Sequence, residues 1–375
     1  MKYGQFVVGS AGEIPLEPDS SVDLVLGFGQ KNYLEADPNY PALRRAFPKA
    51  TIALASSAGE ITGTDVSDQG LSLLTLSFRH TRLRHRKVNT EDFPDSFAAG
   101  RALVKDLFED DLKLVFILSD GGNVNGSELV KGIREELPAT IPVTGGLAGD
   151  GDRFDYTLVG LNEAPRRGRI AAIALYGDQL LVTHGSCGGW EPFGLVRKVT
   201  SSQANELREI DGKNALEVYK RYLGKHADDL PGSALLFPLS IEVEGTDRYL
   251  VRTILSIDEE RQSMIFAGDV PEGSKVRFMM ANRDRLTEAA STAARQAVAD
   301  ADQRPEVALL VSCVGRKLVL GSRTEEEVEA VRNVFGPATA IAGFYSYGEI
   351  SPLVDGGYCA LHNQTMTITC LRETA

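Results

Sequence analysis

The chain has 375 residues, of which 43% are hydrophobic and 25% charged, so it can bury a large core and is expected to form about two domains. A formal net charge of −12 argues against nucleic acid or an anionic membrane surface as the main partner. The sequence has no run of 18 apolar residues and no signal-peptide core, which predicts a cytoplasmic protein that does not enter a membrane.

A strand, a helix and a second strand follow one another at three places in the chain. The three first strands are predicted at apolar runs rich in β-forming residues: 23–28, 114–118 and 307–311. An amphipathic helix then runs up to a proline, which ends the helix because proline lacks the N–H and disfavours helical geometry in the residue before it. The three prolines are Pro48, Pro138 and Pro337.

A turn of glycine and a carboxylate closes each copy, 11 residues after the proline. These turns contain Gly59-Glu60, Gly149-Asp150 and Gly348-Glu349. Two strands joined by a helix pair in parallel, so the turn falls at the carboxyl end of the second strand, where open α/β sheets place ligand clefts. Glu60, Asp150 and Glu349 therefore either cap a turn or a helix N-terminus, or line clefts that bind an ammonium group.

Between the first two units, residues 79–87 concentrate basic side chains, with Arg82, Arg84 and Arg86 on one strand face. This pattern is typical of a solvated edge strand guarded by charge, and anion binding is the alternative. After the second unit, strands are expected at 169–176 and 179–184, joined by a hairpin turn at Gly177-Asp178, which would make the sheet mixed.

A glycine-rich stretch at 185–194 contains Trp190, the only tryptophan, which either plugs the end of a core or walls a ligand pocket. The pattern changes after this stretch, so we predict domains at 1–198 and 199–375. The predicted fold class is α/β, with two domains of mixed β-sheets flanked by helices, built on the strand, helix, strand and Gly-acid-turn unit occurring three times.

The last strand is predicted to alternate through residues 360–370, with His362 and Gln364 on its more apolar face and Asn363 on the other. His362 is either a buried, hydrogen-bonded side chain or a contact to haem or another ligand.

Several motifs together give the chain a specific resemblance. They are Gly145-Gly146-Leu147-Ala148-Gly149-Asp150-Gly151, Gly189-Trp190, Ile210-Asp211-Gly212-Lys213, Phe266-Ala267-Gly268, Cys313-Val314-Gly315-Arg316, Gly343-Phe344-Tyr345-Ser346-Tyr347-Gly348-Glu349-Ile350 and His362-Asn363-Gln364-Thr365-Met366. In these motifs, which span nearly the whole length, the chain resembles the FIST-domain proteins, sensory modules of bacterial signalling with an N-terminal and a C-terminal FIST region.

The resemblance implies a cytoplasmic small-ligand sensor in signal transduction, without enzymatic activity. Its signal would pass to a separate partner such as a histidine kinase or another signalling protein. A branch of stand-alone relatives senses nitric oxide through haem, which makes haem a candidate cofactor and His362 its candidate metal ligand, with His184 as the second choice. The candidate ligand-binding residues are His362, Tyr345, Tyr347, Glu349, Asn363, Gln364, Arg316 and Trp190.

A serine hydrolase is the disfavoured alternative. Ser57 and Ser346 each precede a turn glycine by two residues, as in the nucleophile elbow G-x-S-x-G. The first glycine of that motif is replaced by Ala55 and Phe344, and Leu147 stands in the middle copy, so the motif is incomplete in all three units.

Overall fold

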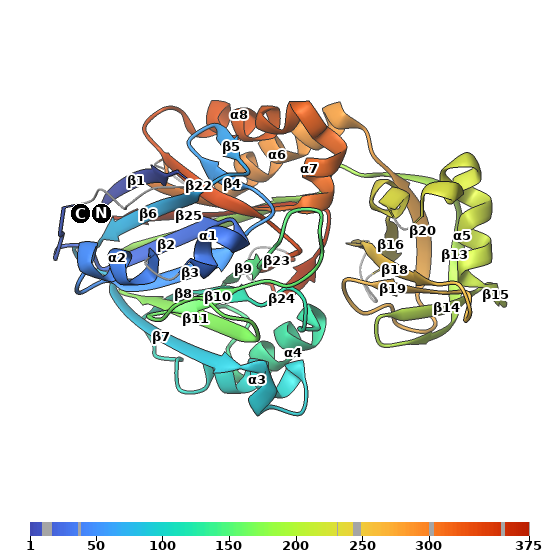
Figure 1. The fold of residues 1–375 in the computed structure, drawn as a ribbon, viewed down its shortest axis with the longest axis horizontal. Coiled ribbons are helices and arrows are strands. Elements are labelled where there is room, and N and C mark those ends of the chain that lie inside the picture. Colours follow the sequence, from blue (N-terminus) through green and yellow to red (C-terminus); the bar gives the residue numbers. More distant parts are fainter. Residues whose placement is uncertain are drawn as a thin grey trace.

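The computed structural model describes residues 1–9, 17–36, 39–230, 232–242, 249–299, 304–353 and 357–374, and the chain folds into two lobes (Figure 1). The large lobe contains the three predicted units, and the small lobe is inserted into the third unit, between β12 and α6. No helix among these residues is both long and apolar enough to cross a membrane.

The elements of the large lobe fall into three comparable sets. The first set is β1 (Lys2–Val8), β2 (Leu24–Gly29), α1 (Lys31–Glu35), α2 (Asn39–Ala46), β3 (Thr51–Ser56), β4 (Glu60–Thr62), β5 (Asp65–Ser67) and β6 (Leu71–Ser77). The second is β7 (Arg82–Asn89), α3 (Ser96–Val104), β8 (Leu112–Ser119), α4 (Gly126–Glu136), β9 (Val143–Leu147), β10 (Val159–Leu161) and β11 (Arg169–Tyr176). The third is β12 (Leu180–Cys187), α6 (Arg283–Ala297), β21 (Val307–Cys313), α7 (Val314–Leu320), α8 (Thr324–Phe335), β22 (Ala340–Ser346), β23 (Gly348–Pro352), β24 (Cys359–His362) and β25 (Met366–Glu373).

The predicted repeat is confirmed. The two strands of each unit pair in parallel, β2 with β3, β8 with β9 and β21 with β22. The helices α2, α4 and α8 end just before Pro48, Pro138 and Pro337, where the missing N–H and the ring of proline stop a helix. The fold is therefore α/β, with mixed sheets flanked by helices.

Strands are exchanged between the units in a cycle. The three sheets run β1-β6-β2-β3-β10, β24-β23-β9-β8-β11-β7 and β12-β25-β21-β22-β4-β5. Each parallel pair therefore has its open edge covered by a strand from another unit, which satisfies backbone groups that would otherwise be exposed. In the first and third units the Gly-acid turn lies where the chain leaves its own sheet for the neighbouring one, between β3 and β4 and between β22 and β23.

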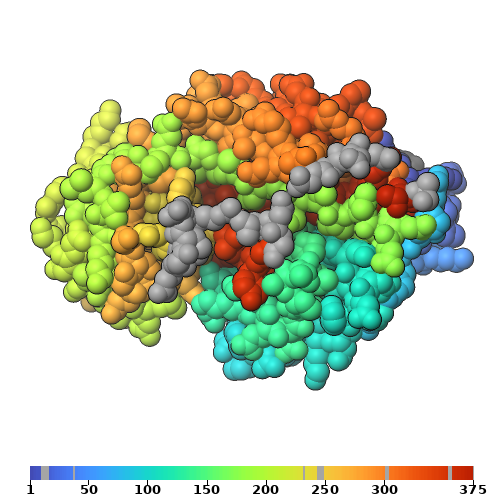
Figure 2. Space-filling model, turned by 180° about the vertical axis from the view of Figure 1, so that it is seen from behind, coloured from blue at the N-terminus to red at the C-terminus, as the bar shows by residue number. Residues whose placement is uncertain are grey.

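Backbone hydrogen bonds join the three turns in the same cyclic sense. They are Gly149 N–H to Ser56 O (2.9 Å), Ala58 N–H to Tyr345 O (2.8 Å) and Tyr347 N–H to Leu147 O (3.1 Å). The inner faces of the three sheets share one apolar core, to which Leu26, Phe116 and Phe344 each contribute. Phe28 and Phe344 stack across it with ring centroids 4.6 Å apart. Seen from the opposite side, the dark-red C-terminal segment lies recessed between the orange segment of α6 and the green segment of α4 (Figure 2).

The small lobe has its own core and sheet. Its elements are β13 (Glu191–Gln203), β14 (Glu206–Ile210), β15 (Lys213–Asn214), α5 (Ala215–Leu223), β16 (Leu239–Glu242), β17 (Tyr249–Arg252), β18 (Ile254–Asp258), β19 (Ser263–Phe266) and β20 (Lys275–Met280). Residues 283–375 return to the large lobe, because their strands complete the third sheet. The predicted division at 1–198 and 199–375 therefore stays a proposal about two regions along the sequence. The two lobes do not follow this division, because the large lobe is formed by two separate stretches of the chain.

Two local predictions are wrong and one is confirmed. The strands on either side of Gly177-Asp178 do not form a hairpin, because β11 pairs with β7 and β8 whereas β12 pairs with β25. The last strand does not alternate from 360 to 370, since the chain leaves one sheet at His362 and enters another at Met366, with Gln364 in the left-handed region at φ 63° between them. As predicted, β7 is an edge strand, the outermost of its sheet.

Candidate functional site

A cleft of about 550 Å³ lies between the two lobes. The large lobe lines it with the loops that follow β8 and β9 and with Tyr347, and the small lobe lines it with residues of β18 and β19. Its main lining residues are Gly121, Gly122, Asn123, Asn125, Phe154, Tyr156, Thr157, Asn205, Ser256, Phe266, Ala267 and Tyr347. The cleft sits at the carboxyl ends of parallel strands, the position expected for a ligand in an α/β fold.

Tyr347 and Phe154 form the aromatic wall of this cleft. Their rings stack with centroids 4.6 Å apart, and Tyr347 Oη accepts a hydrogen bond from Phe154 N–H (3.1 Å) and donates one to Gly151 O (3.3 Å). Burial raises the pKa of Tyr347, so its hydroxyl stays protonated. The hydroxyl is therefore hydrogen-bonded to the loop that contains Gly151 and Phe154, and a ligand in the cleft would contact the ring.

The loop after β8 supplies polar groups, and Asp120 holds its shape. Asp120 Oδ1 accepts hydrogen bonds from Gly122 N–H (2.7 Å) and Asn123 N–H (3.0 Å), and Oδ2 accepts one from Gly168 N–H (2.7 Å). At the end of the loop, Asn125 caps α4 through its side-chain oxygen. The loop thus lines the cleft with a fixed backbone, and the N–H groups of Gly122 and Asn123 are held by Asp120.

Glu349 follows Tyr347 by two residues, but it does not line the cleft and is fully buried. Its carboxylate accepts hydrogen bonds from Ser346 Oγ (2.8 Å), Thr365 N–H (3.1 Å) and Thr365 Oγ1 (2.8 Å). Burial raises its pKa to about 8, outweighing these three donors. In this arrangement Glu349 ties the turn of the third unit to the β24–β25 connection.

Tyr345 and Arg316 belong to a buried network behind the turn. Arg316 binds Glu327 through two nitrogens at 3.1 and 2.7 Å and also donates to Leu286 O (2.9 Å) and to Gly188 O. Tyr345 Oη donates to the other oxygen of Glu327 (2.7 Å). Both side chains are fully buried, so neither is open to a ligand in this structure.

The structure brings the remaining candidates together at the junction of the lobes. Trp190 is 4% exposed and donates from Nε1 to Gln364 O (2.9 Å). Gln364 reaches across to Leu235 O of the small lobe (3.4 Å). Asn363 is fully buried, and neither atom of its amide has a hydrogen-bond partner among the described residues. Of the eight candidates, Tyr347 is the one that lines the interlobe cleft.

His362 does not fit the role of a haem ligand. Its Nε2 lies 3.0 Å from Ser351 O, the ring is 7% exposed, and it is not among the residues that line the interlobe cleft. Burial lowers its pKa to about 4, as expected for a neutral, hydrogen-bonded core histidine. Haem would need an open apolar space beside the imidazole, and His362 lines neither of the two cavities between the lobes.

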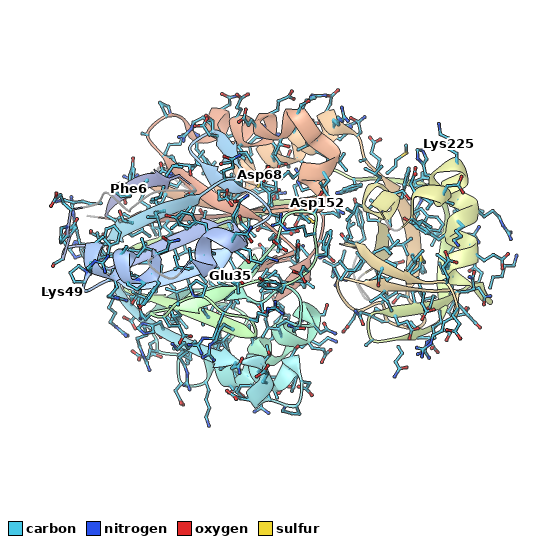
Figure 3. All side chains as sticks on the ribbon, viewed as in Figure 1. Phe6, Glu35, Lys49, Asp68, Asp152 and Lys225 are labelled. Atoms are coloured by element: carbon cyan, nitrogen blue, oxygen red, sulfur yellow. The ribbon has the colours of Figure 1, made fainter. Side chains whose placement is uncertain are left out.

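The three turn carboxylates have different surroundings. Asp150 forms an ion pair with Lys31 (2.8 Å), and Glu349 is enclosed as described above. Glu60 is different, because it lines a cavity of about 360 Å³ near α7, where Figure 3 labels Asp68 and Asp152. One oxygen of Glu60 accepts a hydrogen bond from Ser57, the other has no partner among the described residues, and burial raises the pKa to about 7.

Neither turn serine is arranged as a histidine-activated nucleophile. Ser57 Oγ is hydrogen-bonded to Glu60 and Ser346 Oγ to Glu349, so each hydroxyl has a glutamate side chain as its partner and not an imidazole.

Sequence reasoning missed most of the cleft. The polar run Gly121 to Asn125 follows a buried strand and could have been found by its place at a strand's carboxyl end. The sequence around Phe154 gave no indication of a site, because Phe154 stacks on Tyr347 only once the loop is folded. The contributions of Ser256 and Ala267 depend on where the inserted lobe packs, which local patterns do not show.

Comparison with known proteins agrees with the motifs. The FIST N domain matches residues 23–213, and the FIST C domain matches residues 215–352. An uncharacterized protein of Methanocaldococcus jannaschii is 21% identical over 318 residues, which cover 79% of this chain and 60% of that relative's own length. The solved structure of a cyanuric acid hydrolase from A. caulinodans aligns over 100% of this chain and 99% of its own, with 9% identity and a TM-score of 0.40, too low to support any conclusion. The chain belongs to the FIST family, whose domains generally sense small ligands in signal transduction.

Proposed function

We propose that this protein is a cytoplasmic sensor that binds a small ligand in the cleft at Tyr347 and passes its state to a separate partner, such as a histidine kinase. The cleft supports this proposal most directly. Its volume of about 550 Å³ lies within the range of about 300–1,000 Å³ that small-molecule sites occupy. It combines an aromatic wall with a loop of fixed backbone, and both lobes line it.

The connections between the lobes suit a sensor that changes shape. The chain crosses from the large lobe to the small one at residues 188–190 and returns at residues 281–282, both short segments between strands or helices. Gly189 has a φ of +77°, a conformation that glycine adopts without strain. A ligand that contacts both lobes favours one relative position of the lobes over others, which is the change a partner could read.

Ligand binding can be tested with a substitution that fills the cleft. Ser256 is exposed on the small-lobe wall, so Ser256→Trp should occupy the cleft without disturbing either core. Lys225→Trp is the matched control, because Lys225 lies at the far end of the small lobe (Figure 3). The readout is the melting temperature of each variant against a panel of small metabolites.

We expect at least one metabolite class to raise the melting temperature of the wild type and of Lys225→Trp, and not that of Ser256→Trp. A panel without any shift, or a shift that survives in Ser256→Trp, would contradict the proposed site. We propose no catalytic role for this protein. This would be overturned if the protein hydrolysed a test ester and if Ser57→Ala or Ser346→Ala abolished the hydrolysis.

A further inference from the structure

A second cavity, of about 600 Å³, lies between the lobes, and Asp269 is one of its lining residues. Helix α4 lines it from the large lobe together with β24, and β16 and β17 line it from the small lobe. Asp269 accepts hydrogen bonds from Asn125 Nδ2 (3.0 Å) and Lys131 Nζ (2.8 Å). This bridge links a residue that lines the Tyr347 cleft, Asn125, to residues that line the second cavity, Lys131 and Asp269.

Arg252 is the unusual residue of this second cavity. It is 5% exposed, and its guanidinium donates to three backbone oxygens, those of Leu361 (3.0 Å), Val251 (3.3 Å) and Asp269 (3.3 Å). Among the residues that the structure describes, no carboxylate forms an ion pair with it. Burial lowers its pKa to about 10, which reflects the cost of holding this charge away from water.

The carboxylate of Asp269 is near enough to stabilise this charge but does not contact it directly. A buried charge without a direct ion-pair partner is expensive, so its position beside a cavity calls for an explanation. The other charged side chains on the wall do not form an ion pair with Arg252. The carboxylate of Asp269 is already bound to Lys131, and that of Glu242 to Lys275 (3.1 Å). Arg134, on α4, stacks on the ring of Tyr358 at 4.1 Å and has no carboxylate partner in the described part of the chain. Glu272 also lines the cavity, and its carboxylate accepts a hydrogen bond from Ser202 N–H (3.4 Å). With four basic residues and three carboxylates, the wall has one cation in excess.

We propose that this cavity is a second ligand site, which binds the carboxylate or phosphate group of a small anionic metabolite through Arg252, with Arg134 as a supporting cation. A guanidinium has five N–H donors, and three backbone acceptors leave donors for a ligand oxygen. Arg252 belongs to the small lobe and binds Leu361 O of the large lobe, so an anion at this point would contact the residue that joins the lobes. The site goes beyond the proposed function and does not depend on binding at Tyr347.

Isothermal titration of the wild type with inorganic phosphate and with malonate, at constant ionic strength, tests the proposal. We expect saturable binding of at least one of these probes with one site per chain. Binding of phosphate alone identifies a phosphate ester as the ligand group, and binding of malonate alone identifies a carboxylate. If neither probe binds, the proposal is overturned.

Variants of the two arginines test whether the anion binds in this second cavity. Arg252→Gln is expected to weaken binding of the probe at least about tenfold, as for loss of a charge-assisted hydrogen bond. Should Arg252→Gln fail to fold, Arg134→Gln, at a half-buried position, is expected to weaken binding several-fold. Arg221→Gln is the control, since that side chain is 64% exposed on α5 and should leave affinity unchanged.

Ser256→Trp separates this site from the Tyr347 cleft. Oxyanion binding that persists in Ser256→Trp and falls in the arginine variants supports the second site, even if no metabolite binds at Tyr347. Binding that Ser256→Trp abolishes, or that neither arginine variant changes, would place the anion elsewhere and overturn the assignment.

Discussion

Lys31 and Asp150 form a buried ion pair that joins two of the three units, with 2.8 Å between Nζ and Oδ2. Lys31 follows the first strand of its unit, and Asp150 belongs to the Gly-acid turn of the next. The third unit makes a related contact, since Lys317 Nζ donates to Ala58 O (2.8 Å) beside the turn of the first unit. A basic residue after one strand thus reaches the turn of a neighbouring unit at two of the three junctions.

Replacing Lys31 by Met should destabilise the protein by about 3 kcal/mol, because among the described residues it leaves the buried Asp150 with the half-exposed Arg153 as its one ion-pair partner. Urea denaturation measures the loss. Lys113→Met is the control, since its partner Asp178 is 87% exposed and such surface pairs contribute about 0–1 kcal/mol. The double variant Lys31→Met with Asp150→Asn should recover part of the loss, and strictly additive effects would show that the pair is not coupled.

Glu349 should make stability depend on pH. Its pKa rises by burial from 4.5 to about 8, so between these values the folded protein holds a proton that the unfolded chain has released. The contribution of this group to stability is fully present below about pH 4.5 and is lost as pH rises through about 8, by at most about 1.4 kcal/mol per pH unit.

Glu349→Gln cannot ionise and should remove this dependence. Denaturation of both proteins at about pH 5 and about pH 8.5 would show the wild type losing stability relative to the variant. Glu60→Gln should act in the same direction over a narrower window, because the pKa of Glu60 is about 7. A difference between wild type and Glu349→Gln that stays constant with pH would show that the buried carboxyl is not protonated.

Tyr345 and Tyr347 are close in sequence and should respond differently to substitution. Tyr345→Phe removes the hydrogen bond to Glu327 inside the lobe and should cost about 1–3 kcal/mol of stability without changing ligand affinity. Tyr347→Leu removes the aromatic wall of the cleft and should weaken ligand binding. Titration of a hit from the metabolite panel into both variants measures this, and equal losses of affinity would place the ligand away from the Tyr347 ring.

Protein produced with ample iron and haem precursor should show no Soret band that depends on His362, since that imidazole already contacts Ser351 O in a packed interior. The absorption spectra of wild type, His362→Ala and His184→Ala decide the question. A Soret band lost in His362→Ala and kept in His184→Ala would restore the haem assignment.

Local patterns were sufficient for the repeated unit and its class. Apolar runs, helical spacing and the prolines at 48, 138 and 337 act on their own neighbourhood, because hydrogen bonding and sterics within a few residues decide where a helix stops. The turns at Gly59, Gly149 and Gly348 were visible for the same reason. The same local reasoning wrongly predicted a hairpin at Gly177-Asp178 and one continuous last strand. A turn can join strands of one sheet or of two sheets, and an alternating pattern can continue from one sheet into the next.

Where side chains from distant segments meet depends on the tertiary structure. The exchange of β4, β10 and β23 between units depends on pairing across hundreds of residues, which no local spacing encodes. Arg316 and Tyr345 were predicted to contact a ligand, yet Glu327 on α8 binds both, because that helix packs inward over the third sheet. The repeated unit, its helix ends and the family could therefore be inferred from local patterns. Packing between units and the position of the inserted lobe decided which residues face a cavity, since burial depends on every surface that approaches a side chain and not on its neighbours in the chain.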